Sequence, residues 1–268
     1  TSGSPNIGNN PTTSPANWVQ IPKLYDLVID SNAALDTWCQ CVDGSLKRVY
    51  IKAGAWTAGA LSPTAGVLVN LGAAGTVYVF AEKGSSINYS GSYNGDMRGL
   101  YHATAPTDMS VEQFSGVNIN LTNTYSGQNA RCFYKCTNLT LCTGTGTGNS
   151  TGIGFSDCTN LTSCTGTGLG SSNAHGFYGC TTMIFCKGTG TGSSTGNGYG
   201  FFNNIGMIMC SGQGLATGSG VGYGYQGCTK MQQNKASGAS KTATYNTSYA
   251  DSGSGNAAAD TSAGGYNS

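Results

Sequence analysis

The amino-acid sequence predicts an all-β fold, a parallel β-solenoid in which each coil corresponds to one sequence repeat. Five segments, starting at positions 131, 153, 175, 199 and 223, repeat one pattern that aligns without gaps in its central part. The offsets between these starting positions are 22, 22, 24 and 24, and the length changes fall in Gly- and Ser-rich tracts. Length changes of this kind are typical of loops on one face of a solenoid. Helical periodicity is absent from the repeats, which excludes helical repeat architectures.

Each aligned position of the repeat carries one kind of side chain, which indicates coils stacked about 4.8 Å apart. We therefore expect four core ladders, one aromatic, one aliphatic and two of Cys, and Asn204 and Asn234 each replace one Cys. The predicted ladder residues are Phe133, Phe155, Phe177, Phe201 and Tyr225; Cys136, Cys158, Cys180 and Cys228; Leu139, Leu161, Met183, Met207 and Met231; and Cys142, Cys164, Cys186 and Cys210. The Thr-Gly tracts predict a third strand in each coil, with Thr facing outward and Gly allowing backbones to approach.

The 11 Cys residues of the chain are interpreted through this repeat. A ladder of buried free thiols is favoured, because a stacking column tolerates an Asn replacement whereas a disulfide pair does not. Disulfides within the columns remain an alternative. The Cys-x5-Cys spacing is not typical of a zinc site and no His accompanies it, so we expect no metal and no other cofactor.

Upstream of the repeats, residues 31–43 predict one short helix, with Ser31 as its N-cap and Leu35 and Trp38 on its apolar face. Residues 47–59 are expected to form one strand followed by a turn, and further strands are expected at residues 66–72, 76–84 and 117–122.

Three regions follow from this pattern. Residues 1–25 contain four Pro among Ser, Thr, Gly and Asn, and predict a linker or an extended arm. Residues 26–235 are expected to form the stacked coils. Residues 236–268 lose the Cys columns and are expected either to cap the last coil or to dock on a neighbouring subunit, since an open β edge invites pairing.

A family resemblance covers roughly residues 26–60. The segments SNAALDTW (31–38) and GSLKRVYIKAGAWTAG (44–59) resemble the N-terminal cap of pectate-lyase-like parallel β-helix proteins, which include many phage tailspikes. In those proteins a short helix covers the first coil and a strand begins the stack. The resemblance implies a right-handed parallel β-helix with a capping helix, a phage tail-fibre or tailspike type of protein, and a homotrimer.

The composition argues against two classes of partner. Charged residues make up 9% of the chain and the net charge is +1, which gives no electrostatic reason to expect nucleic acid as a partner. No run of 18 or more apolar residues occurs, so membrane insertion is not expected.

Carboxylates and histidines give no catalytic pattern. Glycoside hydrolysis needs two carboxylates that face each other, but Asp157 is the only acid within the repeats. Asp96, Asp108 and Glu112 precede the repeats, where a paired site is an open alternative. His102 and His175 have no recognisable nucleophile or acid partner. We therefore expect no catalytic residue and no enzymatic activity, with a polysaccharide-degrading enzyme as the second alternative.

Tyr134, Tyr178 and Phe202 follow the core aromatic column and are expected to face outward as an exposed stripe for binding or assembly. The expected function is a structural or receptor-binding module of a phage tail fibre or tailspike, extracellular, on a virion tail or a cell surface. Its expected partners are a cell-surface glycan or protein receptor and other copies of the chain. The first alternative is a self-assembling subunit of an extracellular filament or sheath.

Overall fold

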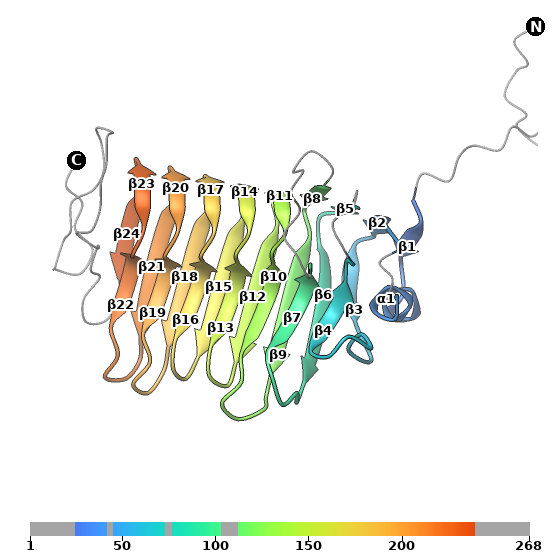
Figure 1. The fold of residues 1–268 in the computed structure, drawn as a ribbon, viewed down its shortest axis with the longest axis horizontal. Coiled ribbons are helices and arrows are strands. Elements are labelled where there is room, and N and C mark those ends of the chain that lie inside the picture. Colours follow the sequence, from blue (N-terminus) through green and yellow to red (C-terminus); the bar gives the residue numbers. More distant parts are fainter. Residues whose placement is uncertain (1–24, 42–44, 73–76, 103–111, 239–268) are drawn as a thin grey trace, which may run out of the picture.

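The computed structural model describes residues 25–41, 45–72, 77–102 and 112–238. These residues form 24 strands and one helix, arranged as a parallel β-solenoid of about eight turns (Figure 1). From β2 onward, successive strands belong to three different sheets in rotation, so each coil adds one strand to every sheet. The predicted all-β fold and parallel solenoid are confirmed.

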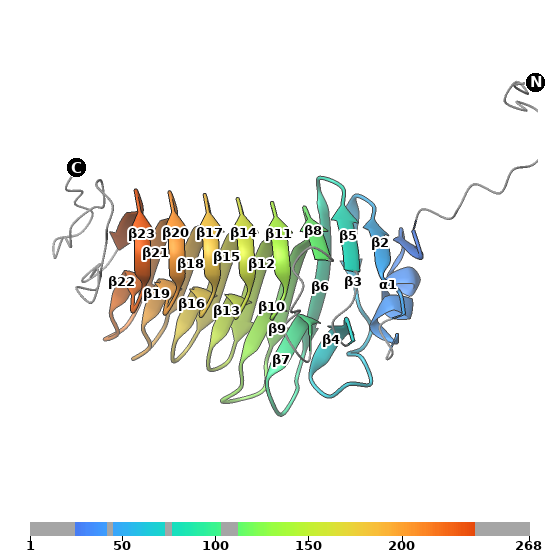
Figure 2. The ribbon, with the colours of Figure 1, turned by 45° about the horizontal axis from the view of Figure 1, so that its top comes forward.

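Three parallel sheets run along the axis, and their strands lie side by side in Figure 2. Sheet 1 contains β1 (Leu27–Ile29), β2 (Arg48–Ile51), β5 (Val77–Ala81), β8 (Glu112–Ser115), β11 (Thr137–Thr140), β14 (Thr159–Thr162), β17 (Thr181–Ile184), β20 (Ile205–Ile208) and β23 (Thr229–Gln232). Sheet 2 contains β3 (Gly54–Thr57), β6 (Ser85–Gly91), β9 (Asn118–Asn123), β12 (Thr143–Gly148), β15 (Thr165–Gly170), β18 (Lys187–Gly192), β21 (Ser211–Ala216) and β24 (Lys235–Gly238). Sheet 3 contains β4 (Val67–Asn70), β7 (Met97–Tyr101), β10 (Ala130–Tyr134), β13 (Gly152–Ser156), β16 (Ala174–Tyr178), β19 (Gly198–Phe202) and β22 (Gly222–Gln226).

Helix α1 (Asn32–Cys39) closes the N-terminal end of the stack, where it packs on β1, β3 and β4 (Figure 1). Ser31 is its N-cap, as predicted, and its hydroxyl accepts a 3.2 Å hydrogen bond from the Ala34 amide. Trp38 and Leu35 are buried beneath it. The predicted helix end at residue 43 is wrong, because the helix already ends at Cys39, where the Gln40 amide donates to the Asp36 carbonyl and the Cys41 amide donates to the Trp38 carbonyl.

Two predicted boundaries differ from the structure. The single strand expected at residues 47–59 is divided into β2 and β3 in different sheets, because the chain turns at Gly54, where φ is 146°. The coils extend to Gly238, past the expected limit of 235. The expected arm at residues 1–25 and the expected cap or tail at 236–268 lie almost entirely outside the described residues.

The core consists of ladders in register from coil to coil. The rings of Phe133, Phe155, Phe177, Phe201 and Tyr225 stack with centroids 4.6 to 5.1 Å apart. Leu139, Leu161, Met183, Met207 and Met231 pair directly along sheet 1 and are buried. Identical positions therefore stack at the spacing of hydrogen-bonded strands, as the repeat predicts.

Sheets 2 and 3 approach each other through glycine. A Cβ atom on Gly154 would lie 2.7 Å from the Gly166 Cα, and one on Gly190 would lie 2.2 Å from the Tyr199 carbonyl oxygen. Real Cβ atoms do not tolerate such distances, so the Thr-Gly tracts bring two backbones together where side chains would hold them apart. The Thr residues of these tracts face outward.

The turns next to sheet 1 use left-handed backbone at residues that are not Gly. One column, in the turn from sheet 1 to sheet 2, consists of Leu141, Ser163, Phe185, Met209 and Gln233, with φ between 51° and 56°. This conformation costs roughly 1–2 kcal/mol for a residue with a Cβ. The sequence indicated loops only in the Gly- and Ser-rich tracts, and this column was not predicted.

Candidate binding surface

The outer face of sheet 3 carries two in-register columns that span six coils. The first column consists of Arg98, Arg131, Ile153, His175, Tyr199 and Tyr223. The second column consists of Tyr101, Tyr134, Ser156, Tyr178, Phe202 and Gln226. Parallel pairing fixes the spacing along each column, so these side chains form a rigid surface without any loop to order.

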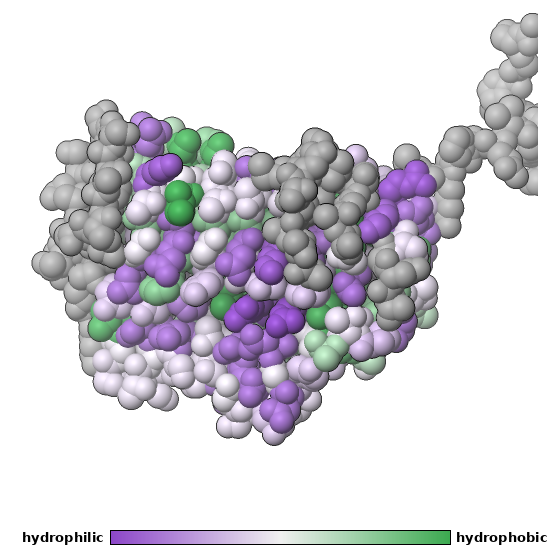
Figure 3. Space-filling model, viewed as in Figure 1, coloured by the Kyte–Doolittle hydropathy of each residue, from purple (hydrophilic) through white to green (hydrophobic). Residues whose placement is uncertain are grey.

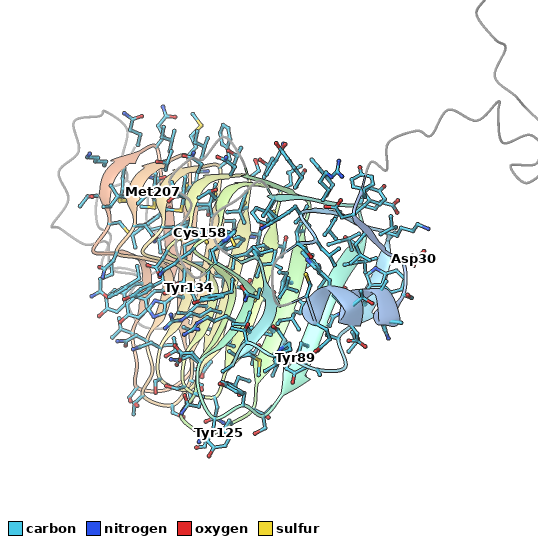
Figure 4. All side chains as sticks on the ribbon, turned by 45° about the vertical axis from the view of Figure 1, so that its right-hand side comes forward. Asp30, Tyr89, Tyr125, Tyr134, Cys158 and Met207 are labelled. Atoms are coloured by element: carbon cyan, nitrogen blue, oxygen red, sulfur yellow. The ribbon has the colours of Figure 1, made fainter. Side chains whose placement is uncertain are left out.

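The structure places the predicted stripe residues Tyr134, Tyr178 and Phe202 in the second column, where each is half-buried (Tyr134 is labelled in Figure 4). They do not form one continuous stripe, because Ser156 occupies the coil between Tyr134 and Tyr178. Tyr178 stacks on Phe202 with ring centroids 5.7 Å apart, and Tyr134 stacks on Tyr101 at 5.6 Å. The stripe is therefore two aromatic pairs with a small residue between them.

The aromatic end of the surface lies over β16, β19 and β22. His175, Tyr199 and Tyr223 stack at 4.9 and 5.1 Å, and Phe202 packs 4.9 Å from the Tyr199 ring. Burial, with a smaller contribution from the positive charge of Arg131, lowers the pKa of His175 to about 4. At neutral pH His175 is therefore an uncharged member of an aromatic column.

The cationic end lies over β7 and β10. The Arg98 guanidinium lies 5.1 Å from the ring centroid of Tyr101 and 5.5 Å from that of Tyr134. Arg131 and Lys135 also lie over the Tyr134 ring, at 5.5 and 5.2 Å. These are cation–π distances. The surface therefore changes along the axis from cationic and aromatic to uncharged and mainly aromatic.

One carboxylate neutralises part of this end. Asp96 Oδ2 lies 3.1 Å from an Arg131 guanidinium nitrogen, and Asp96 Oδ1 accepts a 2.8 Å hydrogen bond from Asn129. No carboxylate among the described residues pairs with Arg98, and the Arg98 Nε is buried without a hydrogen-bond partner.

Arg98 and Tyr101 belong to this surface but were not predicted from the sequence. They precede Arg131 and Tyr134 by a longer offset than any of the offsets that align the repeats. The detectable signal is the shared motif Arg-x-x-Tyr, which reads RGLY at residues 98–101 and RCFY at 131–134.

The Cys columns lie inside the coils (Cys158 is labelled in Figure 4), and all 11 Cys are free thiols. Burial raises the pKa of Cys228 to about 12 and that of Cys158 well above its ordinary value. All ladder thiols except Cys180 reach a backbone carbonyl of the preceding coil, as Cys158 does to Phe133 at 3.6 Å and Cys164 to Leu139 at 3.3 Å. Within the described ranges, no cluster of three or more His, Cys, Asp or Glu could hold a metal ion.

Among the described residues, the carboxylates considered as catalytic candidates do not form a pair. Asp96 binds Arg131 and Asn129, and Asp157 accepts a 2.9 Å hydrogen bond from the Ser156 hydroxyl. Asp108 and the side chain of Glu112 lie outside the described residues. His102 is fully buried, with Nδ1 3.4 Å from the Gly72 carbonyl oxygen.

A shallow groove of about 480 Å³ crosses five coils at the edge where sheet 2 turns toward sheet 3. Its lining is uncharged and rich in hydroxyls, and includes Thr147, Thr191, Ser171 and Asn149 around Leu169. The groove was not predicted from the sequence, which indicated only that the Thr residues face outward from a strand.

Exposed apolar side chains gather at the end of sheet 1. Phe185, Ile205, Ile208 and Met209 lie on or next to β17 and β20, and Leu141 lies in the corresponding turn after β11. Figure 3 shows hydrophobic residues at this edge of the molecule. We call these five residues the apolar edge.

Comparison with known proteins finds no matching family model, no matching curated protein and no matching solved structure. In the part of the chain that the structure describes, no helix has both the length and the apolar character of a membrane span.

Proposed function

We propose that this chain is a non-enzymatic receptor-binding module of an extracellular fibre, of the phage tail-fibre or tailspike type, and that the outer face of sheet 3 contacts a cell-surface glycan or protein. The observation that carries the proposal is the pair of in-register columns on that face, which place aromatic or cationic side chains in five of six coils, with Ile153 and Ser156 in the coil between.

The chemistry of this face supports binding. Tyr and Arg are the side chains most enriched in the energetic centres of interfaces. Half-buried rings such as Tyr178 and Phe202 lose little conformational freedom when a partner covers them, because stacking on neighbouring coils already fixes them. A solenoid also suits a shaft, since each coil contacts only its neighbours and the surface repeats along the axis.

Binding of labelled protein to a panel of intact cells tests this proposal. The double variant Tyr178→Ala and Phe202→Ala removes the half-buried aromatic pair, while Thr167→Ala with Thr189→Ala makes a matched change on the outer face of sheet 2. We expect the parent protein and the sheet 2 variant to bind at least one cell type, and the sheet 3 variant to bind at least about tenfold more weakly. Equal binding of all three proteins would contradict a role for sheet 3.

A second candidate function is a subunit of an extracellular filament or sheath. The apolar edge favours it, because Phe185 and Met209 are 56% and 46% exposed and would be covered by self-association. Light scattering of the purified protein separates the two functions. A discrete oligomer, above all a trimer, supports the fibre module, whereas an open-ended mass distribution supports the filament.

A further inference from the structure

We infer that the cationic end of the sheet 3 surface binds an anionic glycan, whose carboxylate or sulfate groups pair with Arg98 while its sugar rings pack on Tyr101 and Tyr134. This inference rests on the proposed function, since it names the receptor class for the same face of the molecule.

The first support is the positive charge at the cationic end of the sheet 3 surface. The chain contains three Arg residues, and two of them, Arg98 and Arg131, occupy adjacent coils of one column. Asp96 compensates Arg131, but no described carboxylate compensates Arg98. In a chain with 9% charged residues, a guanidinium that has no carboxylate partner among the described residues and lies on a rigid face is complementary to an anion.

The second support is the preorganisation of Arg98. Its guanidinium packs against both Tyr101 and Tyr134, so it is already held in one position before a ligand arrives. The planar guanidinium donates two parallel hydrogen bonds to a carboxylate or sulfate, and such charge-assisted bonds are stronger than neutral ones. A ligand would therefore gain these bonds without the cost of ordering a flexible side chain.

The third support is the arrangement of the tyrosine rings, which favours a glycan over a nucleic acid as the ligand. Binding of single-stranded nucleic acid uses aromatic ring faces on which bases stack. Here the faces of Tyr101 and Tyr134 are turned toward each other at an interplanar angle of 1°, and three cations lie over the Tyr134 ring. Both rings are half-buried, so these contacts leave little ring face on which a base could stack, whereas a sugar needs only hydrogen bonds and C–H contacts with them.

The spacing of the site predicts a linear ligand. Arg98 and Arg131 recur one coil apart, as do Tyr101 and Tyr134, so the site repeats along the axis at about 5 Å. An extended acidic polysaccharide that runs along the axis would bring successive sugar rings past equivalent side chains. The uncharged groove on sheet 2 lacks this charge complementarity.

Calorimetric titration with defined polymers tests the inference. The carboxylate probes are hyaluronan and polygalacturonate, the sulfate probe is heparin, and dextran is the neutral control. Polyglutamate and a single-stranded oligonucleotide test whether any polyanion suffices. The variants are Arg98→Gln and Arg98→Lys, with Lys187→Gln as a matched loss of one exposed cation on sheet 2, and circular dichroism confirms that each variant is folded.

We expect at least one acidic glycan to bind, with an affinity that falls as salt rises. Arg98→Gln should weaken this binding at least about tenfold, Arg98→Lys less, and Lys187→Gln should leave it unchanged. Failure of all three acidic glycans to bind, equal binding of the Arg98→Gln protein, or equal binding of polyglutamate or the oligonucleotide would overturn the inference.

The two proposals can fail separately. If the cell-binding experiment succeeds and acidic glycans do not bind, the proposed function stands and this inference is wrong. If acidic glycans bind through Arg98 and no cell type is bound, the anionic site stands and the proposed receptor-binding function is wrong.

Discussion

In each Cys column one coil carries Asn instead of Cys, and hydrogen bonds explain why both side chains fit. The Asn204 side-chain amide donates a 3.1 Å hydrogen bond to the Phe177 carbonyl of the preceding coil. Cys158 makes the equivalent contact with the Phe133 carbonyl of its own preceding coil. The Asn204 side-chain oxygen also accepts a 2.6 Å bond from the Cys180 amide. A column position therefore selects any small side chain that can donate to the preceding coil.

This explanation predicts unequal effects of two substitutions at Asn204. Asn204→Leu leaves the Cys180 amide and the Phe177 carbonyl without partners in a fully buried site, and should lower the free energy of unfolding by about 3 kcal/mol. Asn204→Cys restores the donor and should cost about 1 kcal/mol or less. Urea unfolding midpoints, compared at constant m value, measure both. Equal costs would show that the amide contacts contribute nothing.

His175 makes stability depend on pH. Its pKa falls from 6.5 to about 4 in the folded protein, so the unfolded state binds a proton more readily. The stability that it contributes is complete above pH 6.5 and is lost as pH falls toward 4, by about 3 kcal/mol at roughly 1.4 kcal/mol per pKa unit. His175→Tyr extends the column of Tyr199 and should remove this pH-dependent part of the stability. Urea unfolding at pH 7 and pH 4 measures the difference. An unchanged pH dependence would contradict the assignment.

At the scale of strands and turns, the side chains of the repeat made much of the fold predictable. The columns that contain Phe155, Cys158 and Leu161 identify the coil, and the Thr-Gly tracts identify its third strand. The left-handed turn column could not be predicted, because Leu141 and Phe185 have no propensity for that conformation and hydrogen bonds to the next coil hold them there.

The candidate site was predictable only in part, for a similar reason. Tyr134, Tyr178 and Phe202 belong to aligned repeats, so their outward position followed from strand alternation. Arg98 and Tyr101 belong to a coil of different length, and no alignment at the period of the repeats reaches them. Their place on sheet 3 depends on the pairing of β7 with β10, which is a property of the folded chain.

Glycine in sheet 2 is needed for the contact with sheet 3. A Cβ on Gly190 would lie 2.2 Å from the Tyr199 carbonyl oxygen and 2.3 Å from that of Ala174. Both obstacles are backbone atoms, so Gly190→Ala should destabilise the protein by more than about 4 kcal/mol. The adjacent Thr189 faces outward, and Thr189→Ala should cost less than about 1 kcal/mol. Thermal unfolding compares the two, and similar transition temperatures would contradict the close approach of the two sheets.

The whole molecule is a one-dimensional stack, in which each coil is stabilised mainly by its two neighbours. Leu161 lies in the middle of the stack, fully buried, between Leu139 and Met183. A charge at this position could not be paired by its neighbours and would interrupt the core on both sides. The same charge on Thr162, which is exposed on the same strand, would remain in water.

Thermal unfolding of Leu161→Asp and Thr162→Asp, followed by circular dichroism, tests the stacked register most directly. The structure predicts that Thr162→Asp keeps the β spectrum and a cooperative transition close to that of the parent protein. It predicts that Leu161→Asp loses both, because an unpaired buried charge costs more than a marginally stable protein can tolerate. If Leu161→Asp folds as well as Thr162→Asp, the register of the coils, and with it the surface on sheet 3, is wrong.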